Sequence, residues 1–148
     1  MAMNKRTMAR GKKMRWDIIG KEIMDPIYAN LGPATRDQQD YVTEFAWGEI
    51  FARRGLPPKT RILLNLAMLT MLGEWQVLGF HIGGALRLGC SRTEIRETLI
   101  QTNTFAGFIN STFACNVAQE VFNEVDKKKR ADARKKKATK GKSRSQKR

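Results

Sequence analysis

The sequence predicts an all-α fold, arranged as a single domain of about six helices. Apolar residues recur every three to four positions through most of the chain, which is the period of an amphipathic helix. No segment shows the sustained apolar–polar alternation of a half-buried strand. The length of 148 residues is sufficient for one domain with a hydrophobic core. We therefore expect a helical bundle without a sheet.

The first half of the chain is expected to hold two helices separated by a loop. Residues 4–19 form a basic candidate helix with few apolar positions. Residues 25–35 contain Pro26 and Pro33, together with asparagine and glycine, and this composition is typical of a loop with at most one helical turn. Residues 36–53 carry aromatic side chains at helical spacing, which predicts the second helix.

The central helices are the most apolar part of the sequence. Residues 58–72 are apolar nearly all round, so we expect a buried helix that Pro58 opens at its first turn. The next helix is bracketed by Gly73 and Gly89. Gly89 stands where a residue in the left-handed conformation commonly ends a helix.

Two further helices complete the predicted bundle. Ser91 and Glu94 have the spacing of a capping box, which predicts a helix that begins at this point and runs to about Ala106. Gly107 then separates it from a last amphipathic helix over residues 109–126.

The net charge of +14 is concentrated at the two ends of the chain. Residues 127–148 hold thirteen Lys/Arg and one acid, whereas residues 17–126 hold nine basic and thirteen acidic residues. We predict a basic N-terminal segment over 1–20, the folded domain over 21–126, and a basic, frayed and then disordered tail over 127–148. The tail is expected to aid solubility. The alternative is sequence-independent binding of nucleic acid, which is expected only through this tail.

The sequence also bears on the compartment. It has no run of eighteen apolar residues, so no membrane span is expected, and its basic start lacks the apolar core of a secretory signal. Cys90 and Cys115 give neither a disulfide framework nor the spacing of a zinc site. A cytoplasmic location is the simplest expectation.

His81, the only histidine, is the first candidate catalytic residue. Gly79, Gly83 and Gly84 surround it, and each glycine inside a helix is less favourable than alanine by about 1 kcal/mol. We therefore expect a pocket or a tight helix–helix contact, with His81 pointing into it. The alternative is a structural histidine bonded to a backbone carbonyl. A metal site is not expected, because there is no second histidine and carboxylates are sparse.

Arg53, Arg54 and Arg61 bracket a turn and form a second constellation. A guanidinium can bind a carboxylate with two parallel hydrogen bonds, so this corner could hold an anionic substrate. For Arg53 and Arg54 a solvated rim is the simpler interpretation, and for Arg61 an ion pair with Glu49 is the alternative.

Aromatic residues and cysteines supply the remaining candidates. Glu49 lies in an aromatic stretch with Trp47, where its carboxylate could orient His81 or Arg61, or instead face water. Trp47 is of a type that more often anchors a core or an interface. Cys90 precedes a predicted helix start, which favours a thiolate, but an inert residue is the simpler interpretation for it and for Cys115.

Several stretches of the chain resemble the carboxymuconolactone decarboxylase family. The resemblance covers about residues 9–126 in one register, without large gaps, and the basic tail lies outside it. The stretches that carry it are Arg10–Arg15, Tyr41–Phe51 (YVTEFAWGEIF), Arg54-Gly55-Leu56, Lys59-Thr60-Arg61, Leu64–Leu69, His81, Gly89-Cys90-Ser91, Glu94–Glu97 and Ala118–Phe122.

The resemblance implies an alkylhydroperoxidase D-like all-α fold that assembles into homo-trimers or hexamers, with sites near the subunit contacts. It implies a cofactor-free decarboxylase of aromatic catabolism that converts 4-carboxymuconolactone, a small carboxylated lactone, into the enol-lactone of β-ketoadipate. The unsaturated lactone accepts the electrons, so no cofactor is required. His81 would supply the proton and Glu49 would set its tautomer, while Arg61, with Trp47 and Arg54, would bind the substrate.

The chain also departs from this pattern. The decarboxylases carry acidic residues four and two positions before the histidine, where this chain has Val77 and Gly79. We therefore expect a less polar pocket, and a different substrate is an alternative. The related thiol peroxidases share the fold and carry cysteines seven and four positions before it, where this chain has Glu74 and Val77. A peroxiredoxin-type protein using Cys90 or Cys115 is the second hypothesis, and a non-catalytic oligomer with nucleic-acid-binding tails is the third.

Overall fold

A computed structural model of the chain describes residues 4–145, with side chains through Lys136. Within this range it contains only helices, which confirms the all-α prediction. Seven are α-helices and one is a π-helix, labelled η1. In chain order they are α1 (Lys5–Ile19), α2 (Lys21–Ala29), α3 (Pro33–Tyr41), η1 (Val42–Phe51), α4 (Pro58–Leu72), α5 (Trp75–Arg87), α6 (Arg92–Gln101) and α7 (Asn103–Ser145).

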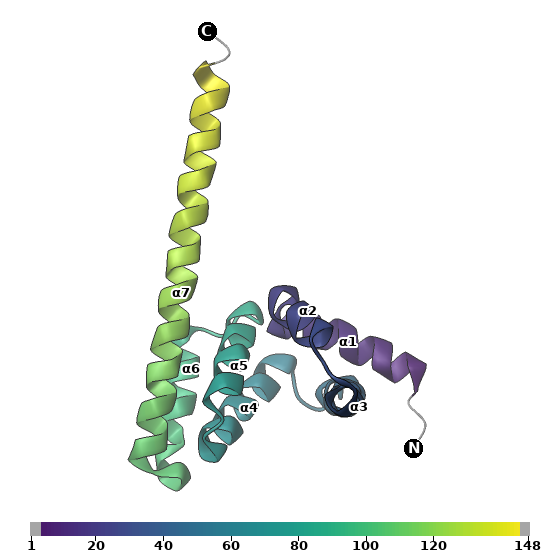
Figure 1. Cartoon of the computed structure of the whole chain (residues 1–148). Helices are drawn as coiled ribbons and strands as arrows, with labels where there is room; N and C mark the ends of the chain where they lie inside the picture. Colours follow the sequence, from purple (N-terminus) through teal and green to yellow (C-terminus); the bar gives the residue numbers. More distant parts are fainter. Residues whose placement is uncertain (1–3, 146–148) are drawn as a thin grey trace.

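The helices pack around one core (Figure 1). Helices α4, α5, α6 and the first half of α7 pack against one another, while α1 packs against both η1 and α5. The fully buried side chains come mainly from the apolar faces of α4, α5 and α6, and include Ile62, Leu66, Leu78, Ile82, Ile95 and Leu99. The central helix α5 therefore contacts helices from both halves of the chain.

The predicted boundaries hold best where they depend on local signals. Helix α4 has the predicted bounds and ends at Gly73, which has a left-handed backbone (φ 71°). Gly89 is likewise left-handed (φ 81°), directly after α5. Gly107 breaks the helical geometry within α7, as its position predicts, but the helix expected to run to about Ala106 ends at Gln101 as α6. The helix predicted over residues 36–53 is found as α3 continuing directly into η1.

The prediction of a loop over residues 25–35 is wrong at both ends, because α2 occupies Lys21–Ala29 with Pro26 inside it and α3 begins at Pro33. Met24 on this helix is only 1% exposed. Burial of an apolar side chain of this size stabilises a structure by about 2 kcal/mol, which offsets part of the helix-breaking tendency of Pro26. Tertiary packing, which the local sequence does not display, therefore explains this helix.

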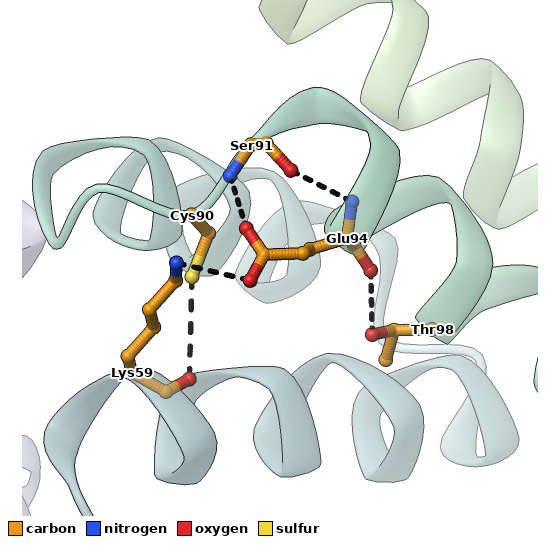
Figure 2. A network of polar contacts seen from close by, with 5 residues as sticks. All are labelled: Lys59, Cys90, Ser91, Glu94 and Thr98. Carbon is orange, nitrogen blue, oxygen red and sulfur yellow. Dashed lines mark hydrogen bonds and ion pairs between the residues drawn. The ribbon is translucent and has the colours of Figure 1, made fainter.

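A capping box joins α4 to α6 (Figure 2). The Ser91 backbone N–H donates to Glu94 Oε2 (2.7 Å), and the Glu94 backbone N–H donates to Ser91 Oγ (3.1 Å). Lys59 of α4 approaches the other carboxylate oxygen of Glu94 at 2.9 Å. The backbone N–H of Ser91 and the Lys59 ammonium lower the pKa of Glu94 to about 2. The predicted capping box is thus confirmed, and it also orients two core helices.

The basic tail continues α7. Helix α7 runs to Ser145 and projects away from the rest of the molecule (Figure 1), and the side chains of residues 131–136 are exposed. The structure therefore has a helix over residues 127–145, where the sequence predicts fraying and then disorder. The functional role of the tail stays a prediction. No helix in residues 4–145 is both long and apolar enough to cross a membrane.

Large apolar side chains lie exposed on α4 and at the start of α7. Leu72, Phe105, Phe108 and Ile109 are each at least 73% exposed. Extended apolar surface of this kind typically marks a protein–protein contact. The predicted homo-oligomer stays a prediction.

Helices α1 and η1 approach each other more closely than side chains would allow. A Cβ atom added at Gly11 would lie 2.0 Å from the Thr43 carbonyl oxygen, and one added at Gly48 would lie 2.4 Å from the Thr7 carbonyl oxygen. Arg10 Nε donates to the Gly48 carbonyl at 2.7 Å across the same contact. The two glycines therefore set the separation of these helices.

We predict that Gly11→Ala separates α1 from η1, because the new methyl group would overlap a backbone oxygen. The expected loss is about 3 kcal/mol of unfolding free energy, or a fall in melting temperature of about 6–12 °C. Thermal unfolding followed by circular dichroism measures it. Gly55→Ala is the control, since Gly55 is exposed with no atom within 4 Å of the added Cβ. Equal melting temperatures for the two variants would contradict this packing.

Candidate functional site around His81

His81 lies on α5, and within the described residues only one of its ring nitrogens has a hydrogen-bond partner. Its Nδ1 is 2.9 Å from the Val77 carbonyl oxygen. A carbonyl oxygen only accepts hydrogen bonds, so Nδ1 carries a hydrogen and Nε2 is the unprotonated atom of the neutral ring. The structure thus has the bond to a backbone carbonyl that the alternative of a structural histidine predicted, while the catalytic role of His81 stays a prediction. This bond also fixes the tautomer that acid–base chemistry at Nε2 requires.

Trp47 forms the aromatic side of this site. It is buried on η1, and its ring centre lies 5.9 Å from that of His81, at an interplanar angle of 35°. Phe51, one turn later, stacks on Trp47 at 4.8 Å. Helical segments of π type are rare and frequently occur at functional sites. The structure thus brings together two of the predicted site residues, His81 and Trp47.

Arg15 on α1 is a further charged residue of this region. Its Nη1 donates to Thr43 Oγ1 at 2.8 Å and its Nη2 to Gln39 Oε1 at 2.7 Å, and its guanidinium lies 5.8 Å from the ring centre of Tyr28. Within residues 4–136 no carboxylate forms an ion pair with it. Burial lowers the pKa of the guanidinium, with Tyr28 opposing the change.

Arg15 was not among the residues singled out from the sequence. It stands in a run of basic residues near the N-terminus, where most side chains are exposed. Its membership of the family-like stretch Arg10–Arg15 was the one signal that could have found it.

The pKa of His81 is lowered. Burial is the largest cause because it disfavours the charged imidazolium, and the positive charge of Arg15 lowers the pKa further. The bond to the Val77 carbonyl opposes both effects. The free protein therefore holds His81 neutral at neutral pH, with Nε2 ready to accept a proton.

The other predicted site residues lie elsewhere within the described chain. Glu49 is exposed, and the Val77 carbonyl occupies the position at Nδ1 that Glu49 was expected to fill. Arg61 Nη2 donates to the Arg53 carbonyl at 3.1 Å rather than pairing with Glu49, and its Nε is buried without a hydrogen-bond partner. Arg54 is exposed at the same turn. Their proposed roles in catalysis and substrate binding stay predictions.

The glycines of α5 serve a different surface from the one expected. Gly79 and Gly83 lie two residues from His81, about 200° around the helix, and so face away from it. They line a cavity of about 590 Å³ together with Trp75, Phe80 and residues of α2 and α7. Gly84 makes the expected close contact, since a Cβ there would lie 3.0–3.1 Å from atoms of Ile18. His81 itself is not among the residues that line this cavity.

Neither cysteine has the properties of a reactive thiol. Cys90 is buried with its Sγ 4.0 Å from the Lys59 carbonyl oxygen (Figure 2), and burial raises its pKa. Burial likewise raises the pKa of Cys115. Thiol chemistry requires the opposite shift. In the part of the chain that the structure describes, no three His, Cys, Asp or Glu side chains form a group that could hold a metal ion.

The sequence model of the carboxymuconolactone decarboxylase family matches residues 36–120, which is more than half of the chain. The chain belongs to this family. It is 35% identical to nitrosuccinic acid decarboxylase npaB of Metarhizium robertsii over 126 residues, covering 84% of this chain and 88% of the relative. It is 31% identical to 4-carboxymuconolactone decarboxylase of Acinetobacter baylyi over 116 residues, covering 78% and 87%. These relatives support a decarboxylase of the carboxymuconolactone decarboxylase family.

We predict that His81 titrates below the ordinary histidine pKa of about 6.5, because burial and Arg15 both disfavour its charged form. Proton NMR of the imidazole across pH gives the midpoint directly, since the chain has a single histidine. The urea-unfolded chain should return to about 6.5.

The sign of the accompanying stability change follows from this difference. The unfolded state binds a proton more readily, so His81 should lower stability as the pH falls below about 6.5. His81→Gln is the control that removes both the NMR signal and this contribution. A midpoint at or above 6.5 in the folded chain would contradict the described environment.

Proposed function

We propose that this protein is a cofactor-free decarboxylase of a small carboxylic acid, with His81 as the residue that carries the proton. The observation behind the proposal is the state of the ring. Its Nδ1 donates to the Val77 carbonyl, its Nε2 has no hydrogen-bond partner among the described residues, Trp47 lies beside the ring, and the positive charge of Arg15 acts on it. General acid–base catalysis requires a group with a fixed tautomer and a pKa set by its surroundings.

The substrate names of the two relatives suggest which acids to test. In both nitrosuccinic acid and 4-carboxymuconolactone, one carbon bears a carboxylate and a carboxymethyl group and is joined to an electron acceptor. The acceptor is a nitro group in the first and an unsaturated lactone in the second. When the bond to the carboxylate breaks, carbon dioxide leaves and the electron pair moves into this acceptor. A built-in acceptor removes the need for an electron-withdrawing cofactor.

The reaction then requires one proton. Nε2 of His81 takes up a proton from solvent and donates it to the carbon atom at which the delocalised anion is quenched. Trp47 gives one side of the imidazole an apolar surrounding, which disfavours the compact charge of the starting carboxylate more than the dispersed charge of the anion. The loss of the two acidic residues expected near the histidine is consistent with this simpler, one-residue proton transfer.

The test is decarboxylation of 4-carboxymuconolactone and of nitrosuccinic acid, measured as carbon dioxide release. His81→Ala should reduce kcat for the accepted acid by at least about 100-fold. Cys90→Ser is the matched control for the redox hypothesis and should retain the wild-type rate. Size-exclusion chromatography of all variants separates loss of chemistry from loss of assembly. Wild-type turnover by His81→Ala would rule out the proposed role, and peroxide consumption that requires Cys90 would favour the redox alternative.

A further inference from the structure

We infer that Arg15 forms a carboxylate-binding site beside His81, and that it holds the carboxylate which the substrate retains after decarboxylation. The inference rests on the proposed function for the identity of its ligand. The binding site itself rests on the surroundings of Arg15, which can be tested without any turnover.

Arg15 has no carboxylate counter-ion within residues 4–136. Arg15 is partly buried, and its polar neighbours are Thr43, Gln39 and Tyr28, none of which is a carboxylate. By contrast, Arg87 and Arg92 pair with Glu22 and Asp126, respectively. A guanidinium has five N–H donors, and Thr43 and Gln39 accept from two of them. Removing a cation from water without a partner is unfavourable, so an anion that completes the remaining hydrogen bonds would be bound strongly.

Helix η1 links the position of Arg15 to that of His81. Thr43, which accepts from Arg15, and Trp47, which lies against His81, are both buried on η1 and are four residues apart. They therefore lie on one face of that helix, about one turn from each other. The positive charge of Arg15 acts on the imidazole across this face. A small acid bound at Arg15 would thus be directed toward His81.

Of the two substrate carboxylates, Arg15 holds the one that is retained after decarboxylation. The departing carboxylate loses its charge as carbon dioxide forms, so a guanidinium bound to it would stabilise the starting acid more than the transition state. The retained carboxylate keeps its charge throughout and can be bound equally in both states. In nitrosuccinic acid and in 4-carboxymuconolactone this is the carboxymethyl group. The expected substrate class is therefore a succinate that bears an electron acceptor on the carbon losing carbon dioxide.

Binding at Arg15 should also supply the catalytic proton. A bound carboxylate offsets the charge of Arg15, and the second carboxylate adds negative charge close to His81, so the imidazole gains affinity for a proton. Other charged groups near α5 do not face the imidazole: Arg87 pairs with Glu22 at the cavity on the far side of the helix. Glu49 on η1 is exposed, and Glu120, Glu124 and Lys128 of α7 line the cavity on the opposite face.

The kinetic experiment compares Arg15→Gln with Arg6→Gln, which removes the same charge from an exposed position on the same helix. Arg15→Gln should raise KM by about 100-fold while changing kcat much less, and Arg6→Gln should leave both unchanged. Arg15→Lys should give an intermediate KM, because an ammonium lacks the two-pronged geometry. If Arg15→Gln does not fold, Arg15→Lys decides, and an unchanged KM would overturn the inference.

A second readout requires no turnover and uses succinate as the probe. Succinate should raise the NMR titration midpoint of His81 in the wild type and in Arg6→Gln, and leave it unchanged in Arg15→Gln. If this pattern appears but no tested acid is decarboxylated, the carboxylate site stands and the proposed reaction fails. If decarboxylation occurs and Arg15→Gln retains both the wild-type KM and the succinate effect, the inference is wrong while the proposed function stands.

Discussion

The contact between Gly11 on α1 and Gly48 on η1 determines where the groups around His81 lie. With hydrogen atoms in place of side chains, the two backbones meet closely enough for one helix to present Arg15 and the other to present Trp47. Because α1 also packs against α5, the same contact locates both groups relative to the histidine. The N-terminal basic helix is therefore part of the candidate site and not an appendage to the domain.

The electrostatics of this arrangement are those of an incomplete site. Arg15 is a partly buried cation with no carboxylate partner in residues 4–136, and His81 is held neutral by burial and by that cation. The buried cation is unfavourable for the free protein, and a bound dianionic acid would both compensate it and favour protonation of His81. A bound acid would explain both the partly buried Arg15 without a carboxylate partner in residues 4–136 and the lowered pKa of His81. Its decarboxylation would require no metal or thiol chemistry.

The sequence predicted those features that depend on local patterns. The capping box at Ser91 and the left-handed Gly89 follow from a few neighbouring residues, and both are found. Helix α2 was missed because Pro26 signals a loop while the burial of its neighbours depends on distant segments. The π geometry of η1 has no counterpart in a 3.6-residue apolar period. Arg15 could not be separated from the basic run around it, since only packing distinguishes one partly buried cation from several exposed ones.

The most direct test of the account is a crystal structure of the full chain with succinate bound. The account predicts one succinate carboxylate in hydrogen-bond contact with the Arg15 guanidinium, and the rest of the molecule directed toward Nε2 of His81 beside Trp47. Succinate bound instead in the cavity of Trp75 and Phe80, on the opposite face of α5, would contradict it. That result would place substrate binding away from the histidine on which the proposed chemistry depends.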